Sequence, residues 1–286
     1  MENLSHEYLK KPDWLRIKLP RAGDYATMKE VSGRRSLHTI CESGLCPNKA
    51  ECWGAGTATF MILGDICTRN CRFCNVKTGR PLPPDPDESQ RVADAIRSMG
   101  VKHCVITSVD RDDLPDGGAS VWAATIRAVK EASPETTIET LIPDFKGDTN
   151  SLQQIIEAGP EVISHNLETV KRMTPEVRSA ARYDRSLKVL RYIAGHSGIR
   201  TKSGIMLGLG ETEEEILETM DDLLEAKCQV ITIGQYLQPT RTHLPVQRYV
   251  HPDDFRRYGE IAKQKGFLFA ESAPLVRSSY HAEKHV

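Results

Sequence analysis

Six of the eight cysteines fall between positions 41 and 74, in two triplets with different spacings. The triplets are Cys41-x4-Cys46-x5-Cys52 and Cys67-x3-Cys71-x2-Cys74. The thiolate is the cysteine form that binds metals, and iron-sulfur cubanes are normally held by four of them. Each triplet is therefore one ligand short, which predicts two sites that each leave a coordination position for another group.

The second triplet has the narrower pattern, with Phe73 directly before its last cysteine. Zinc sites usually pair a Cys-x2-Cys with a second pair of Cys or His, and no Cys or His follows Cys74 before His103. The spacing resembles instead the signature of the radical S-adenosylmethionine (AdoMet) superfamily. In that superfamily three cysteines hold a [4Fe-4S] cluster whose open iron chelates AdoMet. Structural zinc or chance clustering is the alternative.

The bulk composition allows an enzyme of this kind. A chain of 286 residues with 39% hydrophobic content can bury the core of one large α/β domain. The net charge of -1 favours neither nucleic acid nor an anionic membrane as a partner. We find no export signal and no long apolar run, so we expect a cytoplasmic protein without a membrane partner. In a reducing compartment the cysteines are expected to be ligands or core residues, not disulfides.

From residue 58 onward, short apolar runs alternate with amphipathic stretches, which is the βα rhythm of a parallel sheet. Strands are expected over 58–64, 103–109, 136–142, 162–168, 200–207 and 229–237. Helices are expected over 87–99, 119–132, 150–158, 184–195, 212–226 and 252–264. The fifth helix shows the clearest signals, because Thr212 and Glu215 form a capping-box pattern ahead of an apolar stripe. Six such units predict a partial (βα)6 TIM-type barrel.

The barrel is expected to be flanked by two irregular segments within one compact domain. Residues 1–57 form an N-terminal extension that carries the first triplet, with a possible short helix over 24–36. Residues 58–265 form the barrel and residues 266–286 a C-terminal tail that closes the site. Sites in such folds lie at the carboxyl ends of the strands, and the second triplet directly follows the first strand.

The loop after the second strand is polar and contains Thr107, Ser108 and Asp110. Radical AdoMet barrels use a loop at this point to bind the methionine amine. We therefore expect AdoMet contacts here, with an ordinary acidic surface turn as the alternative.

The fourth strand ends in Ser164-His165-Asn166-Leu167-Glu168. Asn166 and Glu168 are two apart on one strand and so point to the same face, which is expected to be the barrel lumen. Ligand contact is favoured for Asn166, and Glu168 is also a candidate AdoMet contact, whereas His165 points the other way and is expected to be structural.

The fifth strand runs into Gly204-Ile205-Met206-Leu207-Gly208-Leu209-Gly210-Glu211. This resembles the superfamily's G-x-I-x-G-x-x-E element, in which an apolar residue, here Met206, packs against adenine and glycines permit close backbone approach. Alone the pattern is weak, and it supports the cysteine motif.

Arg178, Arg182 and Arg185 would share one helical face if the segment after Pro175 is helical. They would then form either a solvated basic face or a site that captures a carboxylate, that of methionine or of a partner protein. The sequence favours neither, and Arg178 is kept as a candidate AdoMet contact.

Near the end of the chain stands Arg277-Ser278-Ser279-Tyr280-His281-Ala282. Together with the two cysteine triplets, this motif makes the chain resemble the lipoyl synthase family from the N-terminal extension to the tail. The segments 51–53, 164–170 and 183–187 also match that family. The ligand motifs show no departure from its pattern.

The resemblance implies insertion of two sulfur atoms, at C6 and C8 of a protein-bound octanoyl-lysine, with two AdoMet molecules consumed. Cys67, Cys71 and Cys74 would hold the AdoMet cluster. Cys41, Cys46 and Cys52 would hold an auxiliary [4Fe-4S] cluster that supplies the sulfur. A tail serine would be its fourth ligand, and we favour Ser279 over Ser278, although both could lie in a solvated tail.

The implied partners are an octanoylated lipoyl carrier domain or H protein, a low-potential donor such as ferredoxin or flavodoxin, and an iron-sulfur cluster carrier. The alternative function is another two-cluster radical AdoMet enzyme whose auxiliary cluster binds substrate or relays electrons. Such enzymes usually carry extra cysteines after the barrel, and none follows Cys228 here. A non-enzymatic electron carrier or zinc-stabilised module would leave the six βα units unused. Cys104 and Cys228 are expected to be buried core residues.

Overall fold

The computed structural model describes residues 9–15, 38–44, 46, 48, 52 and 57–286. Part of the N-terminal extension therefore falls outside the described residues. So do the helix expected over 24–36 and the family-like positions Glu51 and Trp53.

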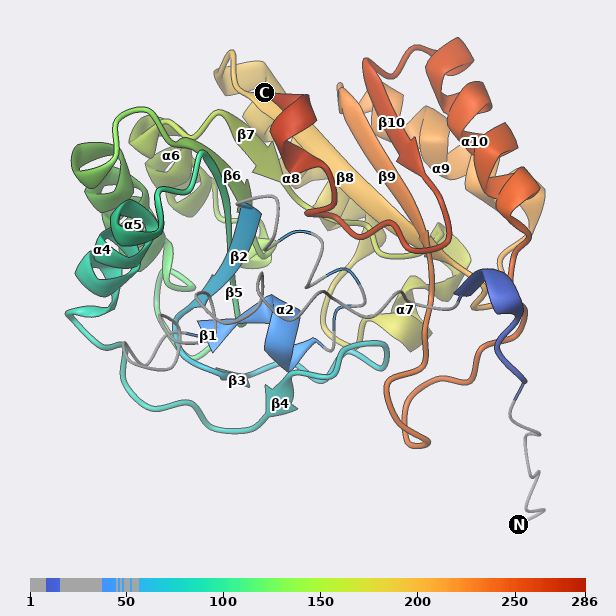
Figure 1. Ribbon diagram of the computed structural model, residues 1–286, viewed down its shortest axis with the longest axis horizontal. Coiled ribbons are helices and arrows are strands. Elements are labelled where there is room, and N and C mark those ends of the chain that lie inside the picture. Colours follow the sequence, from blue (N-terminus) through green and yellow to red (C-terminus); the bar gives the residue numbers. More distant parts are fainter. Residues whose placement is uncertain (1–8, 16–37, 45, 47, 49–51, 53–56) are drawn as a thin grey trace.

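The described chain is built around one eight-stranded sheet with the order β1-β2-β5-β6-β7-β8-β9-β10 (Figure 1). Every neighbouring pair is parallel except β1 with β2. The strands are β1 (His38–Thr39), β2 (Thr57–Ile62), β5 (His103–Ser108), β6 (Thr137–Leu141), β7 (Val162–Ser164), β8 (Arg200–Leu207), β9 (Val230–Gln235) and β10 (Phe269–Ser272). The short parallel pair β3 (Ile66–Cys67) and β4 (Lys77–Thr78) frames the second cysteine triplet.

A helix follows each of the strands β2, β5, β6, β7, β8 and β9 and packs on the outer side of the sheet (Figure 1). These helices are α4 (Glu88–Met99), α5 (Ala119–Ala132), α6 (Thr149–Ala158), α8 (Tyr183–His196), α9 (Glu213–Glu225) and α10 (Pro252–Lys265). Two short helices, α2 (Ile40–Ser43) and α7 (Thr174–Val177), lie in connections. The predicted six βα units of a partial barrel are confirmed.

The helices pack against the sheet through two apolar clusters. One lies under α4, α5 and α6 and contains Trp122 and Cys104, and the other lies under α9 and α10 and contains Phe255 and Cys228. Both cysteines are buried, as predicted. The capping box of α9 is also confirmed, because Thr212 Oγ1 accepts from Glu215 N at 3.3 Å while Glu215 Oε2 accepts from Thr212 N at 2.9 Å.

Two expectations about the middle of the chain are wrong. The strand expected over 162–168 ends at Ser164, and Glu168 returns to β8 only through an isolated bridge with Ile205. The three arginines do not share a helical face, because α7 ends at Val177 and both Arg178 and Arg182 have extended backbone. The sheet also gains β10, which the sequence did not predict.

In the described part of the chain, no helix is both long enough and apolar enough to cross a membrane.

Candidate functional site

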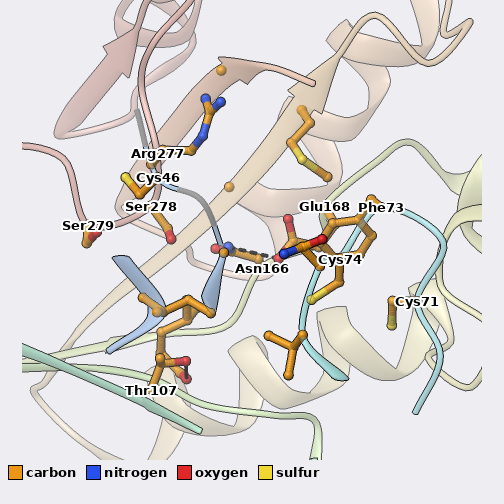
Figure 2. Close-up of a pocket in the computed structure, with 18 of the residues that line it drawn as sticks. Cys46, Cys71, Phe73, Cys74, Thr107, Asn166, Glu168, Arg277, Ser278 and Ser279 are labelled. Carbon is orange, nitrogen blue, oxygen red and sulfur yellow. Dashed lines mark hydrogen bonds between the residues drawn. The ribbon is translucent and has the colours of Figure 1, made fainter. Parts of the chain in front are cut away.

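A cavity of about 480 Å³ opens at the carboxyl ends of the strands. Five of the six motif cysteines line it: Cys41, Cys46, Cys67, Cys71 and Cys74. Figure 2 shows Cys46, Arg277, Ser278 and Ser279 on one side of the view and Cys71, Phe73 and Cys74 on the other, with Asn166 between them. The cavity therefore brings together residues from the extension, the barrel and the tail. Its volume suits a ligand of cofactor size.

The loop of the second triplet is organised around Arg69, which lies between Cys67 and Cys71 in the sequence. Arg69 is only 6% exposed and forms ion pairs with Asp110 at 3.2 Å, Asp112 at 2.7 Å and Asp144 at 2.7 Å. A buried guanidinium needs such partners, because desolvating an unpaired charge is costly. These ion pairs fix the loop to the segments after β5 and β6.

Backbone contacts from three other segments complete the fixation of this loop. Thr68 N donates to the Asp110 carbonyl at 3.0 Å, and Arg72 N donates to the Val177 carbonyl at 2.9 Å. His243 Nε2 lies 2.9 Å from the Cys74 carbonyl. The three thiols are thus presented by a loop whose shape is set by the surrounding barrel.

Burial raises the pKa of Cys71 to about 12 and that of Cys74 to about 11, and it raises the pKa of Cys67 as well. Asp110 adds to the effect at Cys67 and Cys71 by charge repulsion. Without a metal these side chains are neutral thiols at physiological pH. Metal binding must displace their protons, as is general for thiolate sites.

The structure places Thr107, Ser108 and Asp110 on the cavity wall, as predicted for the end of β5. Thr107 Oγ1 donates to the Leu141 carbonyl at 3.1 Å, and Ser108 Oγ accepts from Trp122 Nε1 at 3.3 Å. The backbone N of Asp110 donates to Cys67 Sγ at 3.3 Å. Burial raises the pKa of Asp110 to about 6, even though the Arg69 charge opposes the shift.

Asn166 and Glu168 both line the cavity despite the early end of β7. Asn166 Nδ2 donates to Glu168 Oε1 at 3.0 Å, and the pKa of Glu168 is raised by burial. Among the described residues Asn166 Oδ1 has no hydrogen-bond partner, although it is buried. A buried polar atom of this kind calls for a ligand or water. His165 also lines the cavity, so the expectation that it points the other way is wrong. Its ring nitrogens nevertheless meet the Ile142 carbonyl and Ser186 Oγ, both at 2.9 Å, as expected of a structural histidine.

Close backbone packing explains the glycines of β8 and β9 that border the cavity. A Cβ on Gly204 would lie 2.5 Å from Thr232 Oγ1, and a Cβ on Gly234 would lie 2.1 Å from the Val276 carbonyl oxygen. Gly204 leaves the space beside Asn166 free of a side chain. Gly234 lets the tail residue Val276 pass close to β9. Met206 lines the cavity next to Gly204, where the sequence placed it.

Glu211, the last residue of the G-x-I-x-G-x-x-E element, supports the loop instead of facing the cavity. Its carboxylate accepts from the backbone N of Gly208 at 2.6 Å, Leu209 at 2.9 Å and Gly210 at 3.1 Å. Gly208 and Gly210 have φ values of 103° and 114°, which favour glycine. The element therefore shapes the strand end on which Met206 lies.

Arg178 lines the cavity and is 7% exposed. Its Nη1 donates to the Leu167 carbonyl at 3.2 Å and to Ser186 Oγ at 3.1 Å. Arg185 pairs with Asp144 at 3.1 Å and Arg182 is exposed, so only Arg178 of the three faces the cavity as a candidate ligand contact.

The first triplet and the tail meet on the other side of the cavity. Ser278 and Ser279 line it together with Cys41 and Cys46, whereas Cys52 is not among the described lining residues. Asn48 Nδ2 donates to the Leu275 carbonyl at 2.6 Å, which ties the extension to the tail across 227 positions. Cys52 N in turn donates to the Asn48 carbonyl at 3.0 Å.

The donor set suits the groups that the motifs imply. Thiols and hydroxyls converge from two sides, and the orphaned Asn166 Oδ1 lies beside the glycine-lined floor. Within the described ranges, no three Cys, His, Asp or Glu side chains converge closely enough to hold a single metal ion. Iron-sulfur clusters take cysteine thiolates at separate irons, so this finding concerns mononuclear sites.

Sequence reasoning missed Arg69, Asn48 and Arg277. A charged residue between the cysteines of a buried loop is the signal that could have marked Arg69, because such a charge needs partners. Arg277 was noted only as the first letter of a motif, yet it lines the cavity, and burial lowers its pKa. No sequence signal marks Asn48.

The family model of the Radical SAM superfamily matches residues 61–223. A lipoyl synthase of Parabacteroides distasonis is 60% identical over 98% of this chain and 99% of its own length. A mitochondrial lipoyl synthase of Nematostella vectensis is 58% identical over 96% of this chain and 95% of its own.

Among solved structures, the FeFe-hydrogenase maturase HydG of Carboxydothermus hydrogenoformans aligns with a TM-score of 0.59. That alignment has 15% identity and covers 85% of this chain and 65% of that one. Streptococcus suis SuiB bound to S-adenosylmethionine gives a TM-score of 0.57 at 17% identity, over 82% and 57% of the two chains. At these identities the likeness shows a shared fold.

Proposed function

The chain belongs to the lipoyl synthase family of the radical SAM superfamily, and from this premise we propose that it inserts sulfur at C6 and C8 of an octanoyl chain amide-linked to a carrier-protein lysine. The observation that carries the proposal is that one cavity is lined by the whole second triplet, by Cys41 and Cys46 of the first, and by the tail serines. An enzyme that joins a radical source to a sulfur source needs both within reach of one substrate carbon.

Cys67, Cys71 and Cys74 are proposed to hold the cluster that binds AdoMet. Asn166 Oδ1 is the acceptor best placed for the methionine amine, since it is buried and lacks a partner among the described residues. Hydroxyls and carbonyls at Thr107, Ser108 and Asp110 and the Arg178 guanidinium are further candidate contacts, and Met206 is the adenine-packing candidate. AdoMet and the two clusters supply, when bound, the hydrogen-abstracting 5'-deoxyadenosyl radical and the sulfur atoms.

Cys41, Cys46 and Cys52 are proposed as ligands of the auxiliary cluster, with Ser279 as the fourth. An alkoxide is harder than a thiolate and is easily lost on protonation, so it makes one corner of a cubane weaker than the other three. Such a corner suits a cluster that must give up its sulfur. The support is that Ser278, Ser279, Cys41 and Cys46 line the same cavity.

The cavity wall is largely apolar. It includes Phe73, Leu141, Ile142, Tyr236 and Val276. An octanoyl chain suits such a wall, and the exclusion of water protects a radical reaction from side reactions. The residues thus contribute placement and dryness, while the bound groups contribute the redox chemistry.

The cofactors are proposed to be two [4Fe-4S] clusters and two AdoMet molecules for each lipoyl group. The proposed partners are an octanoylated lipoyl carrier domain or H protein, a low-potential donor of the ferredoxin or flavodoxin type, and an iron-sulfur carrier that rebuilds the auxiliary cluster. They follow from the family and from the need for electrons and fresh sulfide.

Anaerobic reconstitution followed by iron and sulfide counting tests the two-cluster proposal. We expect about eight irons for each wild-type chain and about four after Cys41, Cys46 and Cys52 are all replaced by Ala. The triple variant should still cleave AdoMet but form no lipoyl product. A wild-type chain that holds one cluster would contradict the proposal.

Comparison of Ser279→Ala with Ser278→Ala tests the serine assignment. We expect Ser279→Ala to keep AdoMet cleavage and lose sulfur transfer, while Ser278→Ala keeps both. Unchanged lipoyl formation in Ser279→Ala would refute the assignment.

A further inference from the structure

The last residues of the chain lie inside the barrel at the amino ends of the strands, opposite the cavity. After the serine motif it forms the 3-10 turn η4 (Ala282–His285), which contacts β5. The His285 ring lies 5.7 Å from that of Phe269, the first residue of β10. Figure 1 shows the C-terminus at one end of the strands, and β3 and β4, which frame the cluster loop, at the opposite end. The tail therefore runs from the carboxyl to the amino ends of the strands.

His285 is anchored there by a buried polar network. Lys202 Nζ lies 3.1 Å from His285 Nδ1 and donates to Glu139 Oε2 at 2.9 Å, while Ser164 Oγ donates to Glu139 Oε1 at 2.8 Å. All four side chains are inaccessible to solvent. Arg200 Nη1 also donates to the His285 carbonyl. A charge pair inside a barrel is stable only when its remaining donors are satisfied, and His285 satisfies one proton of Lys202.

The contact with Lys202 fixes the protonation state of His285. A lysine ammonium can only donate, so Nδ1 must accept and the ring must be neutral. Burial, followed by the Lys202 charge, lowers the pKa of His285 to about 3, consistent with that state.

A second anchor holds the tail on the other side of the serines. The Leu275 carbonyl accepts from Asn48 Nδ2, and the Pro274 carbonyl accepts from Gln235 N at 3.1 Å. Val276 is buried against Gly234. Ser278 and Ser279 thus lie between an anchor at 274–276 and an anchor at His285.

We propose that His285 is a positioning residue for sulfur transfer: by fixing the chain end inside the barrel through Lys202, it holds Ser278 and Ser279 against the cavity. This inference rests on the proposed function in that Ser279 completes the auxiliary site. His285 touches no reacting atom. Its role is to restrict the segment that carries the serines from the side opposite residues 274–276, and a ligand held at both sides loses less entropy when it binds.

The first test uses amide hydrogen exchange of the cluster-free protein, which does not depend on activity. In His285→Ala we expect the amides of residues 277–284 to exchange at least about tenfold faster, with the barrel amides unchanged. The matched control is Glu283→Ala, in the same turn but exposed, which should exchange like wild type. His285→Asn, whose Oδ1 can accept from Lys202 in place of Nδ1, should restore protection.

The second test uses the reconstituted enzyme with an octanoylated carrier. We expect His285→Ala to keep AdoMet cleavage within about twofold and to lose about tenfold in lipoyl formation, with His285→Asn recovering most of it. Wild-type exchange or lipoyl formation in His285→Ala would overturn the proposal. Loss of protection throughout the barrel would also overturn it, because the role would then be general stability. If wild type itself forms no lipoyl product, the proposed function fails, while the exchange comparison still decides whether His285 anchors the tail.

Discussion

Arg69 is the residue on which the geometry of the AdoMet-cluster loop depends most. It pairs with three carboxylates while being almost fully buried, and one of them, Asp144, also pairs with Arg185. The burial of Asp144 raises its pKa, but hydrogen bonding and the charge of Arg69 outweigh this and lower it to about 2. The charged network therefore behaves as one unit, and removing its centre takes the shared partner from three carboxylates, of which Asp144 keeps its pair with Arg185.

We expect Arg69→Ala to reduce the free energy of unfolding by about 3 kcal/mol, because it removes the shared partner of three carboxylates, one of them fully buried. Urea unfolding of the cluster-free protein measures this. The matched control is Arg72→Ala, in the same loop, whose pair with Glu176 at 3.0 Å is exposed and should contribute less than about 1 kcal/mol. Equal effects of the two substitutions would contradict the role given to Arg69.

Asn166→Leu tests the proposed acceptor for AdoMet. The substitution keeps the branched shape of the side chain but removes Oδ1, together with the Nδ2 donation to Glu168, so we expect AdoMet to bind about tenfold more weakly to the reconstituted protein. Equilibrium binding measures the change, and iron counting controls for cluster content. Wild-type affinity at wild-type iron content would show that Oδ1 accepts from something other than AdoMet.

At the scale of elements, the periodic segments could be predicted from the sequence and the irregular ones could not. The helices α5 and α9 begin and end within one residue of expectation, because their apolar stripes and end signals are local. The strand expected over 162–168 was wrong beyond Ser164. Glu168 adopts a φ of 66°, and the alternation of polar and apolar residues in this segment does not reveal it. The four residues of β10 are too few to show a period, and only pairing with β9 makes them a strand.

The residues of the candidate site likewise fall into those that the sequence could predict and those that it could not. Five of the six motif cysteines and Met206 lie at the cavity where their motifs predicted them, and Asn166 lies there as its alternation with Glu168 predicted. Arg178 was expected on a helix, and this was wrong because α7 ends at Val177. Its burial at the cavity nevertheless suits a ligand contact. The ties made by Arg69 and Asn48 join segments distant in sequence, and only the folded chain shows them.

The capping box of α9 gives a prediction at this scale. Thr212→Ala removes the acceptor for Glu215 N, and we expect a loss of about 1 kcal/mol in unfolding free energy. Thermal or urea unfolding checks the value. Glu214→Ala in the same first turn, which makes no part of the cap, is the control and should change stability by less than about 0.5 kcal/mol.

At the scale of the whole molecule, an open sheet is completed by segments from both ends of the chain. The extension reaches the tail through Asn48, and the tail continues through the barrel to His285. This arrangement brings Cys41, Cys46 and the tail serines to one cavity although they lie more than 200 positions apart. The sequence motifs predicted the meeting, while the two anchors that enforce it are tertiary contacts.

The C-terminal anchor predicts a pH dependence of stability. His285 stays neutral in the folded chain, with its pKa lowered to about 3 by burial and by nearby charges, chiefly Lys202, His103 and Arg200. In the unfolded chain its pKa is about 6.5, so below that pH the unfolded state takes up a proton that the folded state refuses. Stability contributed by the neutral ring is thus present above about pH 6.5 and is lost as the pH falls toward 3.

Urea unfolding at about pH 7.5 and about pH 5 measures this effect. We expect wild type to lose more unfolding free energy over this interval than His285→Asn, which cannot titrate. Other buried histidines such as His165 are common to both proteins and cancel in the comparison. The same pH dependence in both proteins would show that His285 is not held neutral.

The central claim is that the site of the first triplet supplies the sulfur of the product. The most direct measurement is mass spectrometry of the lipoyl product after a single turnover of enzyme reconstituted with heavy-isotope sulfide, in a reaction whose other sulfur is of natural abundance. We predict that both inserted sulfur atoms carry the heavy isotope and that the Cys41, Cys46 and Cys52 to Ala variant gives no product. A product with sulfur of natural abundance, or product formation by the triple variant, would contradict the claim.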